Sequence, residues 1–124
     1  MKLSTFLVLA SIAYIGFGAG LLIAPGPFMS TYGLSLDESG MLMSRVLGSS
    51  LIGFTLIFWW SRNAPNSETL QAILRASLIY NILDLPTNVI AIQSGLMNTL
   101  AWSAVILHVL LAIGFGYFGF VKQS

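Results

Sequence analysis

Cysteine is absent from the 124-residue sequence, and histidine occurs once. The lack of cysteine excludes disulfides, thiolate metal sites and thiol redox chemistry, and one histidine cannot build a His-rich metal site. Charged residues make up only 7% of the chain, whereas a soluble domain carries about a quarter. A net charge of +1 without any basic run excludes a nucleic-acid footprint. Water is therefore not the main solvent of this chain.

Apolar residues make up 56% of the sequence and gather in four long runs, at residues 3–24, 40–60, 70–93 and 96–120. A membrane-spanning helix needs about 20 mainly apolar residues. The first run follows a lysine, as in a signal peptide, but it exceeds the roughly 7–15 apolar residues of such a segment, so we interpret it as a span. The sequence predicts an all-α protein, with residues 1–124 forming a single integral membrane domain, a four-transmembrane-helix bundle.

The few charged residues predict the orientation. Lys2, Arg62 and Lys122 would share one side of a four-span chain, with Asp37 and Glu38 on the other. Basic residues favour the cytoplasmic side, so both termini are expected there. Asp37 and Glu38 are expected to cap the second span rather than bind a ligand, with Ser35 and Glu38 at capping-box spacing. Asn66 or Ser67 is expected to cap the third span.

Small residues recur four apart in the first two spans: Gly16 and Gly20 in the first, and Ser44, Gly48, Ser49 and Gly53 in the second. Such rows let neighbouring backbones approach closely inside lipid. Packing within the chain is the preferred interpretation, and a homo-oligomer or a larger membrane complex is the alternative. The segment Ser39–Phe58 also resembles Ser94–Phe115, which would make the protein two similar helical hairpins.

The run at residues 70–93 carries polar side chains that lipid would reject. Ser77, Asn81, Asp84 and Asn88 are spaced by four, three and four, so they share one helical face. An ionised carboxylate in lipid is costly, and this face should point into the bundle or toward water. Pro86 removes a backbone hydrogen bond within this face and predicts a kink. Two interpretations of this kink are open: it forms a pocket for a ligand or water, or it only serves the packing of the helices.

Two residues outside this run could join the polar face. Arg45 lies about one turn inside the start of the second span, and its depth predicts an ion pair with Asp84. The alternative is that Arg45 reaches lipid phosphate. His108, in the middle of the fourth span, could extend the polar face and exchange protons, or could be a packed neutral side chain. Arg75 faces the opposite side of its helix from Asp84.

Short motifs resemble the small bacterial four-span proteins of the DoxX-like and related uncharacterised families. They are Tyr32-Gly33-Leu34, Arg45-Val46-Leu47-Gly48 and Phe58-Trp59-Trp60, in a pattern that begins at Pro25. The resemblance implies a four-helix membrane bundle with an arginine near the start of span two, in a bacterial inner membrane. It carries over no catalytic residue.

Three functions are compatible with the sequence. The preferred hypothesis is a membrane module that binds lipid or a small apolar ligand, or an accessory subunit of a membrane complex. Its site would be the polar cluster of Arg45, Ser77, Asn81, Asp84, Asn88 and His108. The alternative is a small oligomeric, proton-coupled transporter. An intramembrane enzyme ranks last, because no nucleophile, metal or cofactor motif is present.

Overall fold

The computed structural model describes residues 1–122, which form helices and connections without any strand. The all-α prediction is therefore confirmed. The chain forms two compact units, Met1–Asn63 and the part that begins at Ala64. Each unit is a helical hairpin, and we call them the first and the second hairpin. Among the described residues, three helices are long and apolar enough to cross a membrane, at Leu3–Ile23, Glu38–Ser61 and Thr99–Val121.

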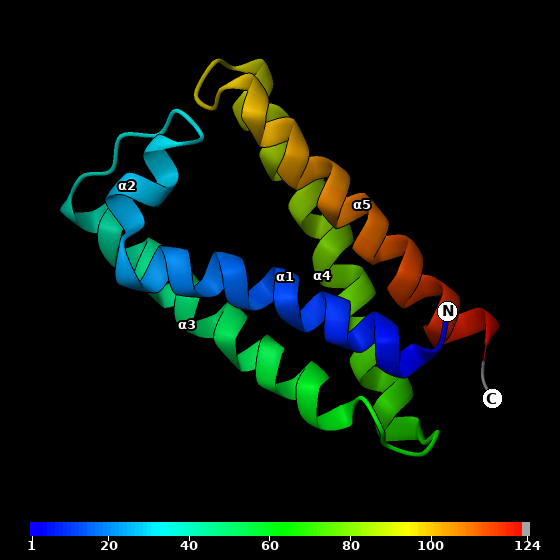
Figure 1. The fold of residues 1–124 in the computed structure, drawn as a ribbon. Coiled ribbons are helices and arrows are strands. Elements are labelled where there is room, and N and C mark those ends of the chain that lie inside the picture. The colour runs from blue at the N-terminus through cyan, green and yellow to red at the C-terminus, as the bar shows by residue number, and fades with distance from the viewer. Residues whose placement is uncertain (123–124) are drawn as a thin grey trace. The chain divides into compact units, whose positions relative to one another are not determined.

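In the first hairpin, helices α1 (Leu3–Ile23) and α3 (Glu38–Ser61) lie side by side (Figure 1). A short helix, α2 (Pro25–Ser30), follows α1 directly. Proline is tolerated in the first turn of a helix because its missing N–H has no helical acceptor there, so α2 begins at Pro25.

The start of α3 agrees with only part of the expected cap. Asp37 Oδ1 accepts a hydrogen bond from the backbone N–H of Gly40 at 2.7 Å. Asp37 is therefore the N-cap and Glu38 lies in the first turn, where a negative charge is favoured. The Ser35–Glu38 capping box predicted by spacing is wrong, because the helix begins after Asp37 rather than after Ser35.

The closest approach of α1 and α3 lies at Gly18 and Gly48. A Cβ added to Gly48 would lie 2.7 Å from the carbonyl oxygen of Gly18 and 2.8 Å from the backbone nitrogen of Leu22. Real Cβ atoms do not approach backbone atoms so closely, so this crossing requires glycine. Gly20 is covered by the ring of Phe28, whereas Gly16 and Gly53 have open space beside them.

In the second hairpin, α4 (Glu68–Gln93) packs along α5 (Trp102–Gly116), as Figure 1 shows. A 3₁₀ turn, η1 (Thr99–Ala101), precedes α5, and a π turn, η2 (Tyr117–Val121), follows it. Ser67 caps α4, since its hydroxyl accepts from the N–H of Leu70 at 3.2 Å.

The turn between α4 and η1 is longer than the sequence predicted. Gly95 adopts a φ of 78°, a left-handed conformation that ends α4 and that glycine adopts without strain. The side chain of Asn98 then accepts from the N–H of Leu100 at 3.1 Å and starts the next helical segment. The predicted start at residue 96 is therefore three residues too early.

Helix α4 runs without a break through Pro86. Its 26 residues correspond to a length of about 39 Å, enough to cross a hydrocarbon core of about 30 Å. It is nevertheless not among the helices apolar enough to be spans by composition. The polar residues on one face of α4 lower the mean hydropathy of the helix. Its polar face, and not its length, therefore separates α4 from the other three long helices.

The two segments that resemble each other differ in structure where they start. Ser39 and Gly40 lie in the first turn of α3, whereas Ser94 caps the end of α4 and Gly95 lies in the turn that follows. The chain does contain two hairpins, but their origin by duplication stays a prediction.

Candidate functional site

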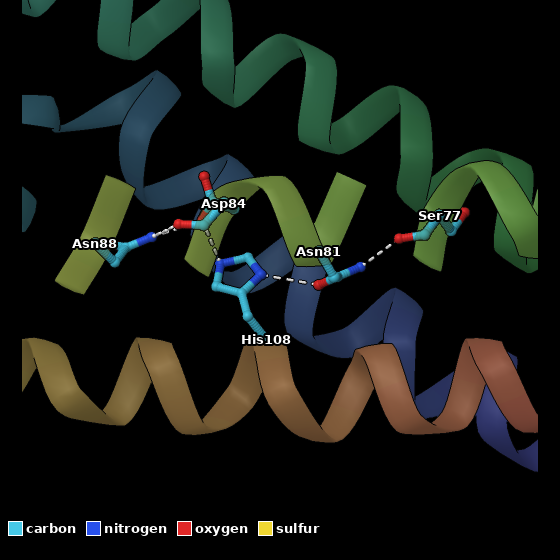
Figure 2. Close-up of polar contacts among 5 residues, drawn as sticks. All are labelled: Ser77, Asn81, Asp84, Asn88 and His108. Carbon is cyan, nitrogen blue, oxygen red and sulfur yellow. Dashed lines mark hydrogen bonds and ion pairs between the residues drawn. The ribbon is translucent and has the colours of Figure 1, made fainter. Parts of the chain in front are cut away.

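The polar residues of α4 meet the one histidine of the chain along the α4–α5 contact. Their helical spacing places Asn81 and Asp84 one turn apart on the face of α4 that receives His108 from α5 (Figure 2). We call Ser77, Asn81, Asp84, Asn88 and His108 the polar cluster. It joins five of the six residues expected from the sequence.

Asp84 is held by two side chains at a single carboxylate oxygen. His108 Nε2 lies 2.7 Å from Asp84 Oδ2. Asn88 Nδ2 donates to the same oxygen at 2.7 Å and to the backbone carbonyl of Asp84 at 2.9 Å. Within the second hairpin, no described residue donates a hydrogen bond to the second oxygen, Oδ1.

The other nitrogen of His108 is bound by a buried amide. His108 Nδ1 and Asn81 Oδ1 are 2.8 Å apart, and Asn81 Nδ2 donates to the carbonyl of Ser77 at 2.8 Å. The hydroxyl of Ser77 donates in turn to the carbonyl of Ile73 at 2.8 Å. Ser77 and Asn81 are 1% and 0% exposed, so this end of the polar cluster is buried.

This network determines where one proton of the imidazole lies. The carbonyl of Ser77 can only accept, so the atom of Asn81 facing it must be nitrogen, and Oδ1 must face the histidine. Nδ1 of His108 therefore carries a hydrogen. The 2.7 Å contact between Nε2 and Asp84 Oδ2 needs one more proton. This proton can lie on Nε2, which gives an imidazolium beside a carboxylate, or on Oδ2, which gives a neutral imidazole beside a carboxylic acid. With this proton in place, the pair has no net charge in either case.

Exposure rises along the polar cluster from Asn81 toward Asp84. The side chain of His108 is 18% exposed and that of Asp84 is 31% exposed. The ring of Tyr80, one turn before Asp84, lies against His108 with centroids 6.2 Å apart at 64°. Tyr80 was not among the candidate site residues, although its spacing of four from Asp84 places it beside them.

Arg45 belongs to the first hairpin, where its side chain is exposed on α3 and its carbonyl accepts from Ser49 Oγ at 3.1 Å. Its predicted ion pair with Asp84 would join the two hairpins and stays a prediction. His108 and Asn88 are the partners that the side chain of Asp84 has within its own hairpin.

Arg75 is occupied elsewhere in the second hairpin. Its Nε donates to the carbonyl of Gly119 at 3.0 Å, and its guanidinium lies 4.7 Å from the centroid of the Phe120 ring. This position is consistent with the opposite side of α4 from Asp84. Among residues 1–122, no group of three histidine, cysteine or acidic side chains is arranged to hold a metal ion.

The fold and the polar cluster define a class: a helical protein with apolar, membrane-length helices and an Asp–His pair inside one hairpin. No known protein family matches the sequence, and neither a curated protein nor a solved structure is significantly similar to it.

Proposed function

We propose that the protein is a small integral membrane protein that binds a small, largely apolar ligand at the polar cluster. The observation that carries this proposal is the asymmetric use of Asp84. Its Oδ2 is held by His108 and Asn88, while its partly exposed Oδ1 has no donor within the second hairpin. A fixed carboxylate with one free oxygen is a directional binding group for the polar end of a ligand.

The neutrality of the pair makes such a site compatible with a membrane. An isolated charge at the bilayer centre costs about 2.5–3.5 kcal/mol on insertion scales and more in other treatments. Asp84 and His108 together carry no net charge in either placement of their proton, and Asn81 and Asn88 satisfy the remaining polar atoms that face them. The pair therefore tolerates lipid while it keeps an acceptor at its exposed edge.

The proposal includes α4 as a fourth span, both termini in the cytoplasm and a bacterial inner membrane as the location. Lys2, Arg62 and Lys122 support this orientation. Lipids are the expected surroundings of the many exposed apolar side chains. Gly16 and Gly53, which have open space beside them, are where a second copy or a larger complex could pack closely.

The direct test compares the wild type with Asp84→Asn after purification in mild detergent. Small molecules that co-purify are extracted and quantified by mass spectrometry. Asp84→Asn should retain about tenfold less of the bound compound, because a charge-assisted hydrogen bond contributes roughly 1.5–3 kcal/mol. Ser103→Ala is the matched control, since the Ser103 hydroxyl only bonds to the carbonyl of Leu100. Equal retention in all three proteins would count against the proposal.

A proton-coupled transporter is the second candidate, and the proton held between Asp84 and His108 favours it. The two side chains come from different helices, so proton loss and helix movement could be linked. Proteoliposome flux of a co-purified compound should then fall in both Asp84→Asn and His108→Ala. A flux that neither substitution changes would remove this candidate.

A further inference from the structure

We infer that the polar end of the ligand is a cationic hydrogen-bond donor, such as the ammonium group of a lipophilic amine, and that it binds in exchange for the proton shared by Asp84 and His108. This inference rests on the proposed function and specifies its ligand class. It follows from the hydrogen-bond inventory of the polar cluster and from its charge.

The donors of the polar cluster are already used. Asn81 Nδ2 donates to the carbonyl of Ser77, and Asn88 Nδ2 donates to Asp84. The hydrogen on Nδ1 of His108 points to Asn81 Oδ1, and the remaining proton lies between Nε2 and Asp84 Oδ2. The group left over is an acceptor, Asp84 Oδ1. A ligand that meets it must therefore donate.

The second hairpin also offers no cation that could hold an anionic ligand at this place. Arg75 is bound to the carbonyl of Gly119 and stacked on Phe120, and it lies half a turn away from Asp84 around α4. The ammonium group of Lys122, beyond the end of η2, lies 5.9 Å from the centroid of the Phe118 ring. Within the second hairpin, the titratable groups of the described residues that face His108 are Asp84 and Tyr80, both on α4.

Charge balance then requires that a proton leaves. The empty Asp–His pair is neutral, so an added ammonium ion would leave the site with one positive charge inside a low-dielectric environment. Release of the shared proton restores neutrality: the ammonium pairs with the Asp84 carboxylate, His108 becomes a neutral imidazole, and one proton goes to water. The cost of a net charge in the membrane favours this exchange of one cation for one proton.

The geometry adds a structural consequence. With Nδ1 protonated toward Asn81, a neutral imidazole presents a lone pair at Nε2, which would face the carboxylate oxygen only 2.7 Å away. In the other neutral tautomer, Nε2 would carry the hydrogen and the lone pair of Nδ1 would face Asn81 Oδ1. His108 can therefore keep both contacts only while the proton is present. Binding of the cation breaks one of the contacts between α4 and α5.

The experiment uses the full chain in lipid nanodiscs and phenethylammonium as the probe. Isothermal titration in two buffers of different ionisation enthalpy measures the number of protons released per molecule bound. We expect about one proton, and an affinity that weakens about tenfold for each pH unit of acidification while the empty pair keeps its proton. Phenylacetate, the anionic counterpart, should not bind. Phenethyl alcohol, a neutral donor, should bind without releasing a proton.

The outcomes separate this inference from the proposed function. Binding of phenethylammonium without proton release overturns the exchange. Failure of phenethylammonium to bind, or preferential binding of phenylacetate, overturns the ligand class even when retention of the co-purified compound still depends on Asp84. Retention that is independent of Asp84 removes the proposed function itself. The proton count and the comparison with phenylacetate are made on the wild type alone. Both tests therefore remain decisive even if the Asp84→Asn protein folds poorly.

Discussion

At the scale of single residues, Asn81 has the most consequence for chemistry although it cannot titrate. It is fully buried, and its amide bridges the carbonyl of Ser77 and the ring of His108. Because the carbonyl accepts only, Asn81 determines which nitrogen of the imidazole bears a hydrogen. The shared proton is thereby confined to the side of the ring that faces Asp84.

The state of His108 can be read directly, since it is the one histidine of the sequence. In protein labelled with ¹⁵N-histidine and purified without a histidine tag, Nδ1 should show the chemical shift of a protonated nitrogen throughout the pH range in which the fold persists. Asn81→Leu should abolish this preference, because the acceptor for Nδ1 is lost. It should also destabilise the hairpin by about 1–3 kcal/mol through the unsatisfied polar groups that remain.

A spectrum of the wild type in which Nδ1 is the unprotonated nitrogen would contradict this assignment. Ser103→Ala serves as the control, because Ser103 is exposed and bonds only within its own turn. Its histidine signals should match those of the wild type.

The residues of α4 in the polar cluster could be predicted from the sequence, but the contact between Asp84 and His108 was not predicted, because depth favoured Arg45 as the partner. The intervals between Ser77, Asn81, Asp84 and Asn88 follow from the geometry of one helix. Whether His108 or Arg45 meets Asp84 depends on how a second helix is rotated and placed, which side-chain packing decides. The spacing of residues along one helix does not determine the rotation of its neighbour.

At the scale of elements, each hairpin has its own means of close packing. In the first hairpin the backbones of α1 and α3 meet at Gly18 and Gly48. In the second hairpin the contact is looser, and a Cβ added to Gly116 would lie 3.7 Å from the side chain of Leu78, an ordinary van der Waals distance. Polar bonds through His108 supplement the apolar contact there.

Substitution of Gly48 should therefore separate α1 from α3. Gly48→Ala places a methyl group 2.7 Å from the carbonyl oxygen of Gly18, and backbone atoms cannot yield cheaply. We expect a loss of about 1–3 kcal/mol in unfolding free energy, as for other overpacked contacts. Reversible unfolding in mixed micelles of increasing denaturing detergent measures it.

Gly53→Ala is the matched control on the same helix, because its added Cβ meets nothing within 4 Å. Its effect should stay below about 1 kcal/mol, the usual difference between glycine and alanine in a helix. Equal destabilisation by the two substitutions would show that α1 and α3 do not cross at Gly48.

The ends of the helices show which sequence features predict a helix boundary correctly. Ser67 caps α4, one of the two residues expected there, and Asp37 with Glu38 starts α3. The start of α5 was placed too early because apolar residues continue into the turn, where only the left-handed Gly95 and the cap at Asn98 end the periodicity. Hydropathy alone does not mark such a boundary.

At the scale of the whole molecule, the predicted Arg45–Asp84 ion pair would join the two hairpins. A guanidinium is itself a cationic donor, so Arg45 would occupy the same oxygen of Asp84 as an amine ligand. Arg45→Met should then bind phenethylammonium about tenfold more tightly than the wild type, equivalent to about 1.4 kcal/mol. Titration calorimetry measures the difference, with Arg62→Met as the control, since Arg62 bonds to Trp59. Unchanged affinity would remove the ion pair.

The topology of the whole molecule depends on whether α4 crosses the membrane. Composition argues against it, because its polar face lowers its apolarity. Packing argues for it. Leu74 lies against Gly119, Leu78 against Gly116, and Asp84 against His108, so α4 accompanies the apolar helix at Thr99–Val121 along most of its length. If that helix spans the membrane, we expect α4 to cross the same hydrocarbon layer.

Single cysteines test this in a chain that has none of its own. Asn63→Cys precedes α4, and Leu96→Cys follows it at a side chain that is 61% exposed. A membrane-impermeant maleimide should label Leu96→Cys in intact spheroplasts and Asn63→Cys only in inverted vesicles. Labelling of both from one side would mean that α4 does not cross, and Arg62 and Lys122 would then lie on opposite sides of the membrane. Because basic residues favour the cytoplasmic side, we expect the four-span result.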